Sequence, residues 1–206
     1  AFAPAPLYAS SGHPELYLAA SLNNDERAMA VILAGKSLQL AQQLGAPAVV
    51  LHAGNVKPVR WRSLFWPAPA SGFLCDLCQN EGSDSPLFKR LTARAQKLRK
   101  RFVVPHWQAL QRSLDELLPR FQKAGVTLCL ENLPSWESLP AEDEALELMN
   151  KYDTAALALW HDLGHGRVRA NLQWSPEHLS VVQTTLPWIR GIHIHDVGGV
   201  AHDHLV

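Results

Sequence analysis

Residues 155–162 read AALALWHD, a continuous apolar run that ends in a histidine and an aspartate. Three other stretches have the same design: 46–52 (APAVVLH), 126–131 (VTLCLE) and 189–195 (IRGIHIH). Continuous rather than alternating apolar residues are typical of strands covered on both faces, as in a parallel sheet. The sequence therefore predicts four parallel strands, each of which ends in polar side chains.

Helical patterns lie between these runs. The first begins at Asn23 or Asn24, stops at Gly45, and carries an apolar stripe that predicts its buried face. Strand and helix thus alternate, which indicates repeated βαβ units and hence an α/β barrel or a doubly wound sheet. The other predicted helices cover 106–124, 142–152 and 176–185, and the stripe of the first contains Met29, Ile32, Leu33, Leu40 and Leu44.

The stretch 55–85 interrupts this alternation, because it is rich in Trp, Pro and Gly and has no clear period. We expect a loop insertion there, within a single domain that spans 1–206. It contains Cys75 and Cys78, a lone C-x-x-C pair and thus a weak signal for zinc or redox chemistry. A basic helix at 87–102 follows, whose charges either contact phosphates or form a solvated face.

Composition excludes several classes of protein. The chain has 206 residues, of which 47% are hydrophobic and 18% charged, with 19 basic and 19 acidic residues. This balance favours one globular domain over a disordered chain or a protein that holds nucleic acid by bulk charge. No apolar run approaches the roughly 18 residues that cross a bilayer, and three cysteines fit a reducing compartment. We expect a cytoplasmic protein without membrane contact.

The ends of the four predicted strands supply two imidazoles and two carboxylates, from His52, Glu131, Asp162 and His193. The carboxyl ends of parallel strands meet at one edge of the sheet, where ligands bind. Such a mixed N/O set suits Zn, Mn or Co. Each residue on its own could merely end an apolar strand, but four in the same structural position favour a divalent-metal site.

Two further clusters extend this edge. In HDLGH, a strand-to-loop turn at Gly164 would let Asp162 and His165 face one cavity, where the imidazole either shares a metal or serves as substrate contact or general acid/base. The final quarter also holds a histidine-rich tail, which is either a second metal site or a solvated, adventitious metal binder. Its histidines are His193, His195, His202 and His204.

Dinucleotide-binding, phosphate-loop and nucleophile-elbow motifs are all missing from the sequence, which disfavours nucleotide cofactors and serine hydrolysis. The motifs that are present resemble the xylose isomerase-like TIM-barrel superfamily, which includes sugar (phosphate) isomerases and epimerases and apurinic endonucleases of the endonuclease IV type. The resemblance extends over nearly the whole chain. It rests on the order of LGAPAVVLHAG (44–54), GVTLCLENLP (125–134), LALWHDLGH (157–165), IRGIHIHD (189–196) and AHDHL (201–205).

The resemblance implies roles for individual residues. Glu131, Asp162 and His193 would bind the principal divalent ion, which is Mn, Mg, Co or Zn in such ligand sets. Glu131 would also be one of two glutamates that move protons beside a carbonyl. His165 would contact the substrate in an isomerase or a further zinc in a nuclease, and His52 would bind another zinc or line the pocket. Substrate contacts are expected from Asn132 and, by stacking on a sugar face, from Trp61, Trp66 and Trp136.

The chain departs from the family pattern in three places. The second glutamate, expected in a G-E-G context after D-H-L, is not reached before Val206. Phe2 and Ala3 stand where nucleases place a zinc-binding histidine, and His202 stands where they have an aspartate. A full barrel needs eight strands and typically about 250 residues. We therefore expect an incomplete barrel without its first and last βα units, either trimmed from a longer product or completed by another chain.

Three functions follow as hypotheses. The leading one is a metal-dependent sugar or sugar phosphate isomerase or epimerase of carbohydrate metabolism, acting by proton transfer through an enediolate. The second is a zinc-dependent apurinic endonuclease, which alone would have nucleic acid as a partner. The third is a barrel fragment that binds metal or sugar without turnover. Apolar faces left by missing units would favour homo-oligomers.

Overall fold

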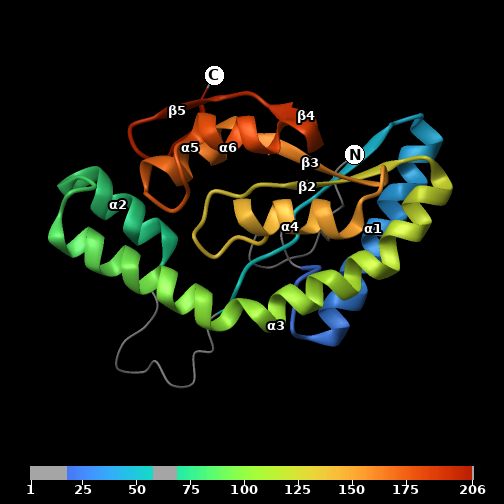
Figure 1. Cartoon of the computed structure of the whole chain (residues 1–206), viewed down its shortest axis with the longest axis horizontal. Helices are drawn as coiled ribbons and strands as arrows, with labels where there is room; N and C mark the ends of the chain where they lie inside the picture. Colours follow the sequence, from blue (N-terminus) through green and yellow to red (C-terminus); the bar gives the residue numbers. More distant parts are fainter. Residues whose placement is uncertain (1–17, 58–68, 206) are drawn as a thin grey trace.

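The computed structural model of the chain describes residues 18–57 and 69–205 (Figure 1). Helices and strands alternate along the chain before a short antiparallel strand pair at the end. A 3-10 helix, Leu186–Trp188, leads directly into the fourth strand. The helices are α1 Asn24–Leu44, α2 Ser71–Glu81, α3 Pro86–Ala124, α4 Glu142–Tyr152, α5 Leu163–Asn171 and α6 His178–Thr185, and the strands are β1 Ala48–Leu51, β2 Thr127–Glu131, β3 Leu157–Asp162, β4 Ile189–His193, β5 Asp196–Gly198 and β6 His202–Leu205.

The main sheet confirms the four predicted parallel strands. Its order is β1-β2-β3-β4, and each neighbouring pair is parallel. The register places Glu131 beside Trp160, and Asp162 beside His193. The carboxyl ends of β2, β3 and β4 therefore lie next to one another at one edge of the sheet.

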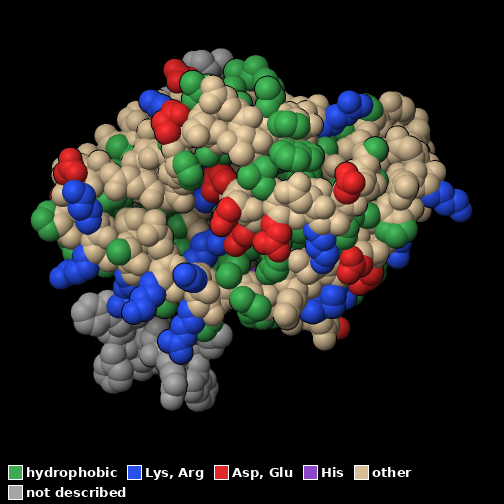
Figure 2. All heavy atoms as spheres, viewed as in Figure 1, with side chains coloured by type: hydrophobic (Ala, Val, Ile, Leu, Met, Phe, Trp, Pro, Cys, Tyr) green, Lys and Arg blue, Asp and Glu red, His purple; other side chains and the backbone are tan. Residues whose placement is uncertain are grey.

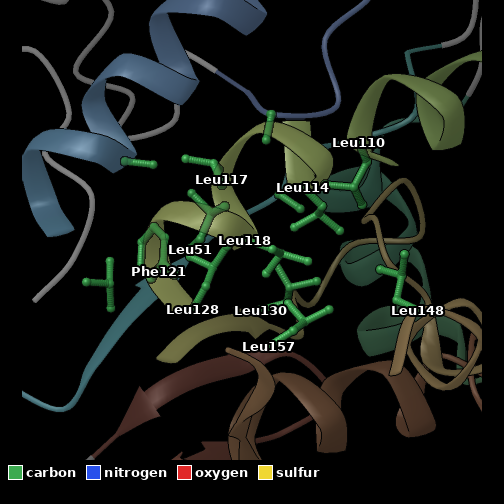
Figure 3. Packing of buried hydrophobic residues seen from close by; sticks show 14 of the residues in the cluster. Leu51, Leu110, Leu114, Leu117, Leu118, Phe121, Leu128, Leu130, Leu148 and Leu157 are labelled. Atoms are coloured by element: carbon green, nitrogen blue, oxygen red, sulfur yellow. The ribbon is translucent and has the colours of Figure 1, made fainter. Parts of the chain in front are cut away.

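Leucines of α3 form the core against this sheet. Figure 3 shows Leu114, Leu117 and Phe121 of α3 close to Leu128 and Leu130 of β2. All five side chains are almost completely buried. Burial of a side chain of this size stabilises a fold by roughly 1.5–3 kcal/mol, so the packing of α3 fixes β2 and the residues at its end.

Helix α1 begins and ends as predicted. The Asn23 side chain accepts hydrogen bonds from two backbone N–H groups of the first turn, and Gly45 ends the helix with φ 65°. The predicted buried stripe is wrong, because Met29, Ile32, Leu40 and Leu44 are exposed. The helix instead buries a face rich in small side chains, which let it pack closely against α3. That face consists of Ala30, Val31, Ala34, Ser37, Leu38 and Ala41.

The expected loop insertion at 55–85 contains a helix. Helix α2 covers Ser71–Glu81 and buries Leu74, Leu77 and Cys78, which share one face. The N-cap residue, Ala70, makes no side-chain cap hydrogen bond. The usual start signal is therefore missing, which explains why the sequence pattern predicts a loop here.

Helix α3 joins two predicted helices into one of 39 residues, with Pro105 inside it. Its second half packs on the sheet, and its first half packs with α2 in a second apolar cluster around Phe88 and Trp136. This packing at both ends outweighs the missing N–H of the proline. Figure 2 shows that Lys and Arg side chains gather where the first half of α3 runs. Among the helices of the described residues, none is both long and apolar enough to span a bilayer.

Candidate metal centre

Three side chains from neighbouring strand ends converge at the carboxyl edge of the sheet. The His193 Nδ1 atom lies 3.1 Å from Glu131 Oε1 and 3.5 Å from Asp162 Oδ2. Two ligands that are each about 2.1 Å from one ion lie about 3.0–3.5 Å apart at the usual angles. The spacing and the donor chemistry of Glu131, Asp162 and His193 therefore fit one divalent ion.

The second oxygen of Glu131 has its own partner. His52, which directly follows β1, places its Nε2 atom 3.1 Å from Glu131 Oε2. Glu131 is 3% exposed and its carboxylate thus lies between two imidazoles, those of His52 and His193. All four residues that the sequence assigns to the metal site are brought together by the structure.

Asp162 is at once the end of β3 and the N-cap of α5. Its Oδ1 atom accepts a hydrogen bond of 2.8 Å from the backbone N–H of His165. The expected strand-to-loop turn at Gly164 is therefore wrong: residues 163–171 are helical, and the aspartate starts the helix. The juxtaposition of Asp162 and His165 does hold, because the His165 Nδ1 atom lies 3.7 Å from Asp162 Oδ2.

Asn132 holds this arrangement together. Its side chain accepts a hydrogen bond from the backbone N–H of Asp162 at 2.7 Å and donates one to the carbonyl of the same residue at 3.0 Å. Its backbone carbonyl accepts a hydrogen bond from His165 Nδ1 at 2.8 Å. Both ends of the Asn132 amide thus bind the backbone of Asp162, and contact of Asn132 with a substrate stays a prediction.

The same bond assigns the tautomer of His165. A carbonyl oxygen only accepts hydrogen bonds, so Nδ1 of His165 carries a proton, and in the neutral imidazole Nε2 then has the lone pair. His165 is buried, and its Nδ1 atom lies 3.8 Å from Glu131 Oε1. Its Nε2 atom is therefore the ring nitrogen able to accept a proton or hydrogen bond from a ligand.

His195 provides a further partner for Asp162. Its Nε2 atom lies 2.8 Å from Oδ1 and 3.0 Å from Oδ2 of the carboxylate. A Cβ atom on Gly164 would lie 1.9 Å from the His195 ring, so only glycine allows the imidazole to lie against the first turn of α5. Sequence reasoning included His195 and interpreted Gly164 as a turn between Asp162 and His165, but it missed that this glycine makes room for the His195 ring.

The electrostatics of the site favour an ionised aspartate. Burial alone raises the pKa of Asp162, whose side chain is 0% exposed. The backbone N–H of His165 and the imidazoles of His165 and His195 outweigh burial, so the pKa of this carboxyl lies below its usual value. Asp162 is therefore a carboxylate at neutral pH, as a metal ligand must be.

Asp162 also belongs to a second group with metal-ligand spacing, formed with His165 and His195. In this group the Nδ1 atom of His165 already donates to a carbonyl. Two overlapping sets thus share one aspartate, and they differ in that Glu131 and His193 occur only in the first.

The remaining predicted site residues lie elsewhere. Trp136 is 2% exposed within the second apolar cluster and donates its indole N–H to the Pro69 carbonyl, so it has no face for a sugar. Trp61 and Trp66 lie outside the described residues. His202 and His204 belong to β6. His202 is exposed and belongs to neither metal-ligand group, and the side chain of His204 lies outside the described part of the chain.

A stacked histidine pair lies beside the site, formed by a buried and a partly buried residue that no sequence pattern links. His161 and His178 stack with their Nε2 atoms 3.0 Å apart. Burial, followed by the charge of His178, lowers the pKa of His161 to about 4. Both rings approach Gly166, where a Cβ atom would lie 2.6 Å from His178 Nε2.

Comparison with protein families agrees with this geometry. A family model described as xylose isomerase-like TIM barrel matches residues 5–206. The chain belongs to this family, which confirms the resemblance drawn from the strand-end motifs. No curated protein sequence matches the chain.

Solved structures share the fold. A D-tagatose 3-epimerase-like protein superposes with a TM-score of 0.59 and 20% identity, over 90% of this chain and 54% of that one. The 3-keto-D-glucoside 4-epimerase YcjR from E. coli has a TM-score of 0.57 and 13% identity, over 87% of this chain and 55% of that one. L-ribulose 3-epimerase superposes with a TM-score of 0.55 and 18% identity, over 86% of this chain and 46% of that one.

At these identities the likeness shows the fold alone. The chain spans about half the length of these structures. A parallel sheet with helices that matches half of a TIM barrel is consistent with the expected incomplete barrel. The solved structures named here are sugar epimerases or a protein named as epimerase-like.

Proposed function

We propose that the chain carries the metal centre and half of the proton-transfer apparatus of a divalent-metal-dependent sugar or sugar phosphate isomerase or epimerase. The observation that carries this proposal is the convergence of Glu131, Asp162 and His193 from three adjacent strand ends. A bound Mn, Mg, Co or Zn ion would act there as a Lewis acid that polarises a substrate carbonyl.

The protein's own residues suit proton transfer next to that carbonyl. Glu131 is buried and hydrogen-bonded to His52 and His193, so its carboxylate is fixed in position and shielded from water. A fixed carboxylate can remove a proton from the carbon beside the carbonyl, which gives an enediolate. With Nδ1 bonded to the Asn132 carbonyl, a neutral His165 would accept a hydrogen bond from a substrate hydroxyl at Nε2.

The test uses the chain as it is, without requiring a complete turnover. Metal content is measured after dialysis against mixed divalent ions, and aldoses and ketoses are then incubated with the protein in D2O. One bound ion per chain and deuterium uptake beside the carbonyl support the proposal. Metal binding without deuterium uptake in any sugar would instead support a barrel that only binds.

A second function has a specific observation in its favour. The Asp162–His165–His195 group and the position of His52 next to Glu131 would allow more than one zinc ion, as an apurinic endonuclease requires. Two or three tightly held zinc ions together with cleavage of abasic DNA would favour this alternative over the isomerase.

A further inference from the structure

The carboxylate of Asp162 is held unequally at its two oxygens. Oδ1 lies 2.8 Å from both the backbone nitrogen of His165 and the Nε2 atom of His195, and the same Nε2 atom lies slightly farther, 3.0 Å, from Oδ2. Oδ2 is the oxygen that lies 3.5 Å from His193 Nδ1, within the candidate ligand set. The two donors on Oδ1 therefore fix the rotation of the carboxylate that presents Oδ2 to an ion.

From this geometry we propose that His195 is a positioning residue, which orients Asp162 for the metal by a hydrogen bond and does not itself bind the ion. This inference rests on the metal site in the proposed function. Beyond the three candidate ligands, it adds to that site His195 and also Gly164, which makes room for the His195 ring.

Distances distinguish this role from that of a ligand. The His195 Nε2 atom lies 2.8 Å from Oδ1 and 3.0 Å from Oδ2 of Asp162. Both are hydrogen-bond lengths, and the shorter one is below the about 3.0–3.5 Å that separates two ligands of one ion. A second ion between Asp162, His165 and His195 would also compete with the bond from His165 Nδ1 to the Asn132 carbonyl if that nitrogen were the ligand.

Gly164 gives independent evidence that the position of His195 is built into the fold. A Cβ atom at residue 164 would lie 1.9 Å from Cε1 and 2.5 Å from Nδ1 of His195. The imidazole of His195 is therefore confined between the backbone of α5 and the Asp162 carboxylate. Alanine is the better helix former by roughly 1 kcal/mol, yet here it would displace the ring.

The experiment measures Mn²⁺ and Co²⁺ binding by calorimetry and the visible spectrum of the Co²⁺ protein. We expect His195→Ala to weaken affinity about 10- to 100-fold, without changing the number of ions or the Co²⁺ bands at saturation. His195→Gln retains an N–H donor and should restore most of the affinity. Gly164→Ala should reproduce the loss, although it removes no polar group.

The double variant is the decisive measurement. If Gly164→Ala acts by displacing His195, it should have no further effect in the His195→Ala background. Gly72→Ala is the matched control, because this glycine is also helical but has open space around its Cβ position. Ile194→Ala controls for changes next to His193, since Ile194 is 75% exposed.

Several results would overturn the inference. His195 is a ligand if wild type binds two ions and His195→Ala binds one, or if the Co²⁺ bands change as they do in His193→Ala. Additive losses in the double variant would separate Gly164 from His195. A wild-type chain that binds no ion would instead refute the proposed function itself, a result read without any variant.

Discussion

The two ends of the parallel sheet carry different side-chain chemistry. A cavity of about 530 Å³ lies at the amino ends of β2, β3 and β4. Among the described residues that line it, Arg190 alone has a charged side chain, and most of the others are apolar or small. The carboxyl ends of the same strands bear Glu131, Asp162 and His193. Convergence of titratable groups, and not the size of the cavity, therefore identifies the candidate site.

The direction of the strands explains this difference. In a parallel sheet each strand ends where the next helix begins, so backbone N–H groups and strand-end side chains meet at the carboxyl edge. Asp162 shows the consequence, since it both ends β3 and caps α5. At the amino edge, helix α3 ends at Gly125, and the side chains nearby, such as Phe121, belong to the apolar core.

The largest effect is expected from Glu131→Gln, compared with Thr127→Val at the opposite end of β2. The first removes the charge of a proposed ligand and proposed base, so bound metal should be lost and deuterium exchange should fall by about 10²- to 10⁴-fold. Thr127 lines the amino-end cavity and its hydroxyl donates to the Ala155 carbonyl, so its replacement should leave bound metal and deuterium exchange unchanged. Elemental analysis and D2O exchange check this, and equal activity of the two variants would remove Glu131 from the site.

A core change between the two ends should separate stability from metal binding. Leu128 is fully buried under α3, and Leu128→Ala should lower the free energy of unfolding by about 2–5 kcal/mol. The ligands lie at the other end of β2, so metal affinity of the folded variant should change little. Urea unfolding and calorimetry measure the two quantities. If Leu128→Ala kept the wild-type free energy of unfolding but lost metal affinity, the core and the metal site would not be independent of each other.

The same division explains what could be predicted from the sequence. Apolar runs bounded by glycine fix strands and their ends, so the four strands and the meeting of Glu131 with Asp162 and His193 follow from pattern alone. Helix faces were less predictable, because α1 packs through small side chains and exposes Ile32 and Leu44. The role of Gly164 depends on a ring 31 positions later in the chain, a contact that local patterns do not contain.

Acid should lower the free energy of unfolding through a histidine at the carboxyl end of β3. The pKa of His161 is lowered to about 4, chiefly by burial, whereas an unfolded histidine titrates near 6.5. The unfolded chain therefore binds this proton first, so the stability is complete above about pH 6.5 and is lost as pH falls toward 4. At pH 5 the loss from this group is on the order of 2 kcal/mol.

Denaturant unfolding of metal-free protein between pH 7 and 5 measures this effect. His161→Gln should reduce the dependence on pH, although part of it should persist because burial also lowers the pKa of His178. Arg190→Gln, at the amino end of β4, should leave the dependence as in wild type. An unchanged slope in His161→Gln would assign the acid sensitivity to other groups.

The smallest functional effect is expected from Cys75→Ser combined with Cys78→Ser, outside both ends of the sheet. The two thiols lie on α2, and Cys78 is buried in the second apolar cluster with Leu74 and Phe88. Burial raises the pKa of the Cys78 thiol, which disfavours the thiolate that would bind zinc. Metal content and exchange should therefore match wild type, and only stability should fall, by about 1 kcal/mol for the buried hydroxyl. Loss of one zinc per chain would instead show that α2 carries a metal site of its own, independent of the carboxyl edge.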